Sequence, residues 1–242
     1  MRVEGLQMRR RKQKMIQALP QQPSSNHEMR EKFEAKTKGQ KEYIRSMIEN
    51  DVVFATGPAG TGKSYLALGL ACQYLLDGRY DKIVICRPTV EASPKGLGFI
   101  PGDISEKLSP YVMPAVEHIK KFIGRDRYYK EFHLENIKFE ALEYMRGRTF
   151  SNSFIIVEEA QNCTTEQLKM IVTRIGEDSK IVINGDVDQT DLKIKHGESI
   201  IDFEYVINKL ERADLDLFGI VELTELDIIR NPLIAGFLRA MR

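Results

Sequence analysis

Four short apolar runs constrain the fold of this chain more than any other feature of its sequence. The runs are rich in β-branched residues and continuous, with no alternation of apolar and polar positions. Such runs are typical of parallel strands that helices cover on both faces. Helical patterns separate the runs, which predicts a single α/β domain with a mainly parallel sheet. The runs are Val52–Ala55, Lys82–Cys86, Phe154–Val157 and Lys180–Ile183.

Composition divides the chain into a polar arm, residues 1–36, and the α/β domain, residues 37–242. The arm contains the basic run Arg9–Lys12 and the loop-like segment Pro20–Ser25. Its low apolar content predicts a mobile arm and not a folded domain. A basic run of this kind is typical of a solvated tail or, less often, of a binding element.

The overall composition excludes several classes of protein. Apolar residues make up 42% of the chain, enough for a globular core, and the formal net charge is only +1. Any surface for a polyanion must therefore come from local clustering of basic residues. Cys72, Cys86 and Cys163 are dispersed without ligand spacing, which argues against a zinc or disulfide framework and fits a reducing compartment. With neither a membrane-length apolar stretch nor a hydrophobic signal core, we expect a soluble, cytoplasmic protein.

A glycine-rich loop, GPAGTGKS, directly follows the first apolar run and precedes an expected helix at Tyr65–Leu76. It matches the spacing G-x-x-x-x-G-K-[ST], in which backbone N–H groups surround phosphates, the lysine neutralises them and the hydroxyl ligates Mg²⁺. The strand before it and the helix after it favour a phosphate site over a plain glycine-rich turn. The predicted nucleotide-binding residues are Gly57, Pro58, Ala59, Gly60, Thr61, Gly62, Lys63, Ser64 and Tyr65, and Lys63 is also assigned to catalysis.

Two acids, Glu158 and Glu159, follow the third apolar run. One acid at such a strand end can hold Mg²⁺ directly or through water, while its neighbour polarises the attacking water. We assign Glu158, with Ser64, to the metal and Glu159 to catalysis; a pair of solvated strand-end acids is the alternative. After the fourth run, Gln189 in the segment GDVDQ is a candidate sensor of the γ-phosphate, although a polar turn would look much the same.

Six segments in this order resemble the PhoH-like family: GPAGTGKS, RPTVEA, YMRGRTF, VEEAQN, GDVDQ and IIRNP. The resemblance extends from about Gly39 to the C-terminus. It implies an ATPase with a RecA-like P-loop NTPase domain, similar to the first motor domain of superfamily 1 helicases, that uses ATP and Mg²⁺. It also implies association with single-stranded RNA or DNA and ring-shaped homo-oligomers.

The resemblance implies roles for residues outside the phosphate loop. Gln40 occupies the place of a glutamine that reads adenine in similar proteins. Arg230 precedes Asn231–Pro232, a good start for a final helix, so it could act as an arginine finger in the same chain or across an interface. A surface salt bridge is its alternative role. The candidate nucleic-acid contacts are Arg87, Thr89, Lys95, Arg146 and Arg148.

Two positions depart from the family pattern, and both bear on the rate of hydrolysis. Glu158 stands where the family usually has Asp; its extra methylene can alter how Mg²⁺ is held. Asn231 stands where the family usually has His.

The chain after the phosphate loop has no room for a second motor domain, so translocation by a monomer is not expected. We therefore predict a homo-oligomer that couples ATP hydrolysis to binding or remodelling of a single strand. One alternative is a nucleotide-dependent clamp that hydrolyses ATP slowly and never unwinds. Another is a P-loop kinase for a small molecule, which VEEAQN and GDVDQ argue against.

Overall fold

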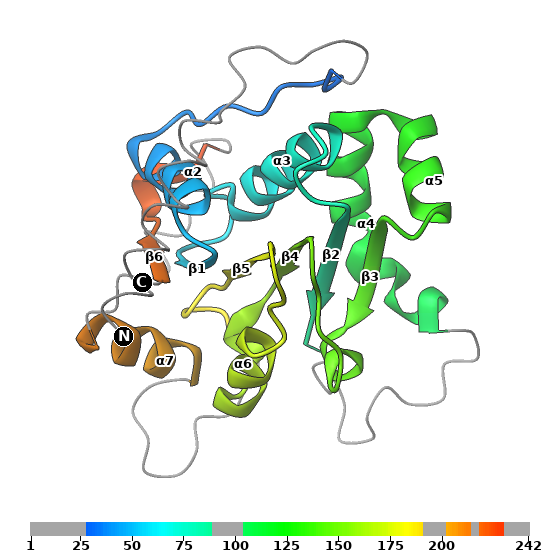
Figure 1. The fold of residues 1–242 in the computed structure, drawn as a ribbon. Coiled ribbons are helices and arrows are strands. Elements are labelled where there is room, and N and C mark those ends of the chain that lie inside the picture. Colours follow the sequence, from blue (N-terminus) through cyan, green and yellow to red (C-terminus); the bar gives the residue numbers. More distant parts are fainter. Residues whose placement is uncertain (1–27, 89–103, 191–201, 214–217, 230–242) are drawn as a thin grey trace, which may run out of the picture.

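The computed structural model describes residues 28–88, 104–190, 202–213 and 218–229, with only the backbone described for residues 104–111. Figure 1 shows these residues as a sheet with helices on either side. Most of the predicted N-terminal arm lies outside the described residues. Its last part, residues 28–36, packs on the domain, since Phe33 lies against Gly69 and its ring is 6.2 Å from that of Phe122. The packed part of the chain thus begins before the predicted boundary at residue 37.

The sheet has six strands, all parallel, in the order β3-β2-β4-β5-β1-β6. The four inner strands coincide with the four predicted apolar runs, which confirms the predicted α/β fold with a parallel sheet. They are β1 (Val52–Thr56), β2 (Lys82–Arg87), β4 (Ser153–Val157) and β5 (Lys180–Asn184). The two edge strands, β3 (Ile137–Ala141) and β6 (Phe218–Glu222), were not predicted.

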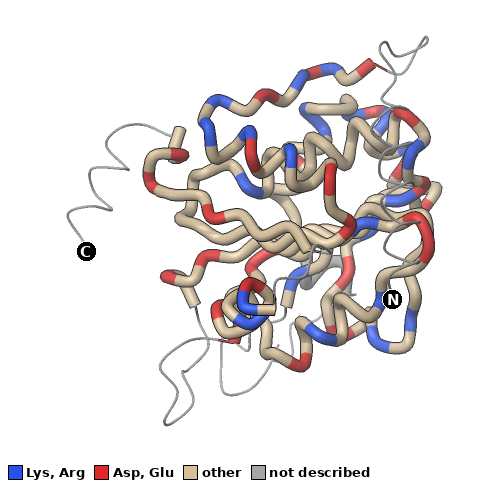
Figure 2. Tube along the Cα trace, turned by 60° about the vertical axis from the view of Figure 1, so that its left-hand side comes forward, with Lys and Arg blue, Asp and Glu red and all other residues tan. Residues whose placement is uncertain are grey.

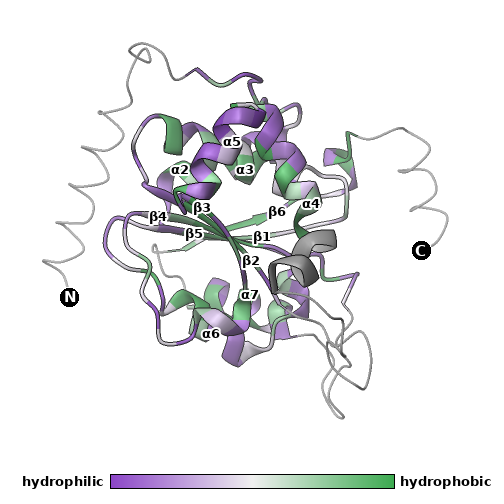
Figure 3. Ribbon diagram, turned by 90° about the vertical axis from the view of Figure 1, so that its right-hand side faces the viewer, coloured by the Kyte–Doolittle hydropathy of each residue, from purple (hydrophilic) through white to green (hydrophobic). Residues whose placement is uncertain are grey.

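Helices form a layer on each face of the sheet (Figure 3). The first layer comprises α2 (Lys38–Glu49), α3 (Lys63–Leu76), α4 (Ile104–Ile123) and α5 (Arg125–His133). The second comprises α6 (Thr165–Val172) and α7 (Asp202–Arg212). Three 3-10 turns complete the described elements: η1 (Leu142–Met145), η2 (Ala160–Asn162) and η3 (Glu225–Asp227). Among the described helices, none is both long and apolar enough to cross a lipid bilayer.

Strand β4 shows why the inner runs are continuously apolar. Phe154 and Ile156 point into the core beneath the first helix layer, whereas Ile155 and Val157 point into the core beneath the second. All four are fully buried. Burying such a side chain stabilises the fold by about 1.5–3 kcal/mol, so both faces of the strand favour apolar residues.

The parallel arrangement brings the ends of β1, β2, β4 and β5 to one edge of the sheet, where ligands bind in open α/β folds. Gly57 follows β1, Arg87 ends β2, Glu158 follows β4 and Asn184 ends β5. Residues from four separate segments of the sequence therefore meet at this edge.

Candidate functional site

The glycines of the phosphate loop allow a backbone that other residues would strain. Gly57 has φ of 140°, and a Cβ there would collide with the Leu223 carbonyl oxygen. Gly62 has φ of 88° and is the N-cap of α3, where it makes no side-chain capping hydrogen bond. The first N–H groups of α3 therefore lack a side-chain cap at the loop, and with the helix dipole they favour an anion.

The Lys63 side chain folds back into the loop. Its Nζ donates to the Gly57 carbonyl at 2.5 Å and to the Pro58 carbonyl at 3.0 Å. Burial lowers the pKa of Lys63, although Asp186 and the two glutamates act to raise it. The ammonium group thus lies partly desolvated within the curl of the loop, where a phosphate would be its strongest available partner.

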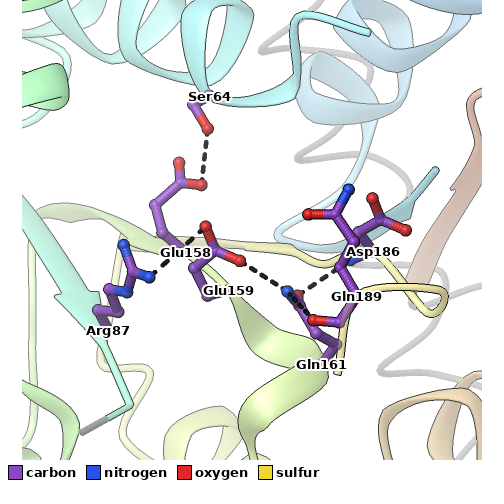
Figure 4. Close-up of polar contacts among 7 residues, drawn as sticks. All are labelled: Ser64, Arg87, Glu158, Glu159, Gln161, Asp186 and Gln189. Carbon is purple, nitrogen blue, oxygen red and sulfur yellow. Dashed lines mark hydrogen bonds and ion pairs between the residues drawn. The ribbon is translucent and has the colours of Figure 1, made fainter. Parts of the chain in front are cut away.

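Glu158 lies against the start of α3. Ser64 Oγ donates to Glu158 Oε2 at 2.7 Å, and Asn184 Nδ2 donates to Oε1 at 3.2 Å (Figure 4 shows the first contact). Burial raises the pKa of Glu158 to about 7; the hydrogen bonds from Ser64 and Asn184 act against the shift, Glu159 adds to it, and Lys63 also opposes it.

A hydroxyl and a carboxylate at this spacing are the hard oxygen donors that Mg²⁺ prefers. A partly buried carboxylate whose pKa is raised by desolvation would be stabilised in its charged form by a nearby cation. Ser64 and Glu158 therefore fit a Mg²⁺ ion. Tyr43 extends the network from α2, since its hydroxyl donates to Asn184 Oδ1 at 2.6 Å.

Glu159 points elsewhere. It has φ of 57°, in the left-handed region that non-glycine residues rarely adopt. In Figure 4 its carboxylate lies between Arg87 and Gln161, while Glu158 extends toward Ser64. Gln161 Nε2 donates to Glu159 Oε2 at 2.6 Å, and Arg87 Nη2 lies 3.7 Å from Oε1. The turn after β4 thus sends its two acids in different directions.

Gln161 connects Glu159 to the loop after β5. Its amide nitrogen also donates to the Gln189 carbonyl at 3.2 Å, and its amide oxygen accepts from the Asp186 N–H at 3.0 Å. Neither Gln161, which lies within VEEAQN, nor Asn184 was assigned a role from the sequence. For Asn184 the available signal was a polar side chain directly after the apolar run Lys180–Ile183.

Asp186 lies beside the phosphate loop from the same β5 loop. Its Oδ2 is buried without a hydrogen-bond partner among the described residues, and burial raises the pKa of its carboxyl group. Gln189 is exposed in the same turn, where its N–H donates to the Asp186 carbonyl at 3.0 Å. Asp186 and Lys63 interact electrostatically, since each shifts the pKa of the other toward its charged form, and this pairing was not predicted from the sequence.

Gln40 is buried, and its amide bonds within the protein. Nε2 donates to the Thr61 carbonyl at 2.8 Å and to the Asp227 carbonyl at 3.4 Å, while Oε1 accepts from the Lys36 N–H at 2.8 Å. Gln40 thereby ties α2 and η3 to the phosphate loop. Its role in reading adenine remains a prediction, and it would require an exchange of these bonds.

The predicted nucleic-acid contacts lie in different surroundings. Arg146 is exposed, whereas Arg148 forms a 2.5 Å ion pair with Glu140 and lies over the Phe150 ring. Figure 2 shows Lys and Arg interspersed with Asp and Glu along the trace. Thr89, Lys95 and Arg230 lie outside the described residues, so their roles stay predictions.

Comparison with known proteins shows what this chain is similar to. A sequence model described as PhoH-like protein matches residues 32–242. A PhoH-like protein of Bacillus subtilis is 41% identical over 207 residues, which cover 85% of this chain and 62% of that protein. A PhoH-like protein of Synechocystis sp. is 39% identical over 229 residues, covering 95% and 68%. Protein PhoH of Escherichia coli is 34% identical over 209 residues, covering 85% and 57%.

The chain thus spans between 57% and 68% of the length of these curated relatives. With a phosphate loop between β1 and α3 of a parallel sheet, its architecture is an α/β P-loop NTPase fold. Because the family model matches residues 32–242 and a relative is 39% identical over 95% of the chain, the chain belongs to the PhoH-like protein family.

Proposed function

We propose that this protein is a Mg²⁺-dependent ATPase whose hydrolysis is coupled to the binding of single-stranded RNA or DNA. The observation that carries the proposal is the Ser64–Glu158 hydrogen bond, which joins the phosphate loop to the acidic end of β4. A metal-dependent phosphoryl-transfer site needs the hydroxyl of the phosphate loop and the strand-end carboxylate close enough to act on one metal ion. Membership of the PhoH-like family supports the same reading.

In this proposal the loop binds the triphosphate and Lys63 neutralises it. Lys63 would exchange its two carbonyl partners for β- and γ-phosphate oxygens, a stronger, charge-assisted contact. Ser64 and Glu158 would hold Mg²⁺, which supplies charge neutralisation between the same phosphates. The N–H groups at the start of α3 would orient the phosphates.

Glu159 would act as the general base that orients and deprotonates the attacking water. It adjoins Glu158 in the chain yet turns away from the metal-binding pair, so the two carboxylates can serve different steps. Gln189 and Arg230 complete the proposed set as γ-phosphate sensor and arginine finger. The finger would come from the same chain or from a neighbour.

The nucleic-acid side of the proposal rests on Arg87, at the end of β2 beside Glu159. A single domain offers a strand only one wall, so neighbouring copies in a homo-oligomer would supply the rest. A ring would allow this because heterologous contacts can close. The slow clamp remains the second candidate, favoured by a Glu159 carboxylate that is already engaged by protein groups.

ATP turnover measured with Mg²⁺ or with EDTA tests the proposal, in the presence of single-stranded RNA, single-stranded DNA or no polymer. We expect Mg²⁺-dependent turnover that Lys63→Ala abolishes. Lys169→Ala, an exposed change on α6, should turn over like the wild type. Turnover by Lys63→Ala at the wild-type rate would refute the site. Mass measurements with and without ATP test oligomerisation, and strand displacement separates a motor from a clamp.

A further inference from the structure

Protein groups engage both carboxylate oxygens of Glu159. Oε2 accepts a 2.6 Å hydrogen bond from Gln161, and Oε1 lies 3.7 Å from the Arg87 guanidinium. The carboxylate lies between these two side chains and not toward Ser64 (Figure 4). A general base must accept a proton from water, so engaged oxygens oppose that role.

The two restraints differ in strength. Gln161 is 1% exposed, and hydrogen bonds to the β5 loop fix its amide. The side chains of Arg87 and Glu159 are 35% and 40% exposed, and their separation exceeds a hydrogen bond. Ion pairs this exposed contribute little and exchange readily. The Arg87 contact is therefore the one that a ligand can break.

The backbone keeps Arg87 and Glu159 within reach of each other whether or not their side chains touch. The Glu158 N–H donates to the Cys86 carbonyl at 2.9 Å, which continues the pairing of β2 with β4 to the site. Cys86 precedes Arg87 and Glu158 precedes Glu159. The ion pair can therefore open and close without any movement of the sheet.

We propose that Arg87 restrains Glu159 while no polymer is bound, and that a phosphate of a single strand releases it. The inference rests on the proposed ATPase function and names its regulation. A guanidinium binds phosphate through two parallel hydrogen bonds, whereas Arg87 Nη2 lies 3.7 Å from the Glu159 carboxylate, beyond hydrogen-bond distance. The phosphate takes the place of the carboxylate beside Arg87, and Glu159 becomes available to water. Arg87 is thus a positioning residue that links strand binding to hydrolysis.

The test compares wild type, Arg87→Ala, Arg87→Lys and the control Arg45→Ala. Arg45 pairs with Glu49 at 2.8 Å on exposed α2, so its removal breaks an Arg–Glu pair away from the site. We would measure kcat and KM for ATP without polymer, and then at saturating oligo(U) RNA or oligo(dT) DNA. Thermal unfolding of each variant reports on folding.

Arg87→Ala should raise the polymer-free kcat by about 1.5-fold to fivefold, the range set by the strength of a half-exposed ion pair. KM for ATP should stay unchanged, and neither polymer should stimulate the variant further. Arg87→Lys should keep a low polymer-free kcat and part of the stimulation, because it retains the charge. Arg45→Ala should match the wild type throughout.

A polymer-free kcat for Arg87→Ala at or below the wild-type value would overturn the restraint and leave the ATPase proposal intact. Full stimulation of Arg87→Ala at saturating polymer would overturn it equally. Absence of turnover by the wild type under every condition would instead overturn the proposed function, and the restraint with it. Stimulation by RNA alone or by DNA alone would support the restraint and identify the strand.

Discussion

The hydroxyl of Ser64 donates a 2.7 Å hydrogen bond to the carboxylate of Glu158, 94 residues later in the chain. Ser64 lies in the first turn of α3, which follows β1 and the phosphate loop, and Glu158 follows β4. The intervening strand β5 contributes Asn184, which donates to the other oxygen of the same carboxylate. Groups that follow or end three different strands thus meet at one carboxylate.

Ser64→Ala and Glu158→Ala should each raise the Mg²⁺ concentration needed for half-maximal ATP turnover, by on the order of tenfold or more. Because both side chains would contact the same ion, the double variant should lose less than the product of the two single effects. A Mg²⁺ titration at fixed ATP measures all three. Strictly multiplicative effects would show that the two residues do not act on the same ion. An unchanged Mg²⁺ requirement would remove them from the metal site.

The raised pKa of Glu158 should make stability depend on pH in the protein free of Mg²⁺ and nucleotide. The pKa is about 7 in the folded chain against an ordinary value of 4.5, so between these values the folded state binds more protons than the unfolded state. The free energy of unfolding therefore falls as pH rises through this window, by on the order of 1–3 kcal/mol for a partly buried group. Above the window it levels off.

Glu158→Gln does not titrate and serves as the reference for this pH effect. Urea unfolding from pH 4.5 to 8 should show the wild type losing stability relative to Glu158→Gln as pH rises. A constant difference between the two proteins across the series would contradict the assignment.

Glu159→Gln should preserve binding of ATP and Mg²⁺ while slowing hydrolysis about a hundredfold or more, as expected for loss of a general base. The Gln161 amide can still meet the new amide oxygen, so folding should be maintained. Equilibrium binding of a fluorescent ATP analogue and single-turnover hydrolysis separate the two effects. Normal turnover would remove Glu159 from catalysis.

Gln40→Ala should destabilise the protein by about 1–3 kcal/mol, since the buried Thr61 carbonyl and the Lys36 N–H would each lose a partner. Lys41→Ala, on the exposed neighbouring position, should have almost no effect. Comparing ATP and GTP affinities of the same variants tests the adenine role separately. Equal weakening of both nucleotides would show that Gln40 supports the loop without reading the base.

Arg146→Ala should weaken binding of a single strand and reduce the slope of log affinity against log salt by about 0.7. Arg148→Ala should change the slope less, because Glu140 and the Phe150 ring already engage that guanidinium. Affinities across a salt series measure both. A larger slope change for Arg148→Ala than for Arg146→Ala would show that Arg148, and not Arg146, makes the stronger contact with the strand.

Local sequence was sufficient to identify the inner strands and the phosphate loop. Strands β1, β2, β4 and β5 are buried on both faces, so each one reads as an apolar run. Edge strands β3 and β6 carry partly exposed positions among apolar ones, and their sequences, IKFEA and FGIVE, contain charges or glycine. Such mixed segments fit a strand only once a neighbouring strand has formed.

Residue types and their spacing along the chain specify the chemistry of the site: a lysine and a hydroxyl in a glycine-rich loop, with two acids at the end of a buried strand. How these groups pair with one another depends on tertiary contacts. Glu158 meets Ser64, Glu159 lies between Arg87 and Gln161, and the Gln40 amide bonds to the loop and to η3. Strand order and backbone angles set most of these pairings, since they bring together side chains that are distant along the chain. Spacing in the sequence does not encode such contacts.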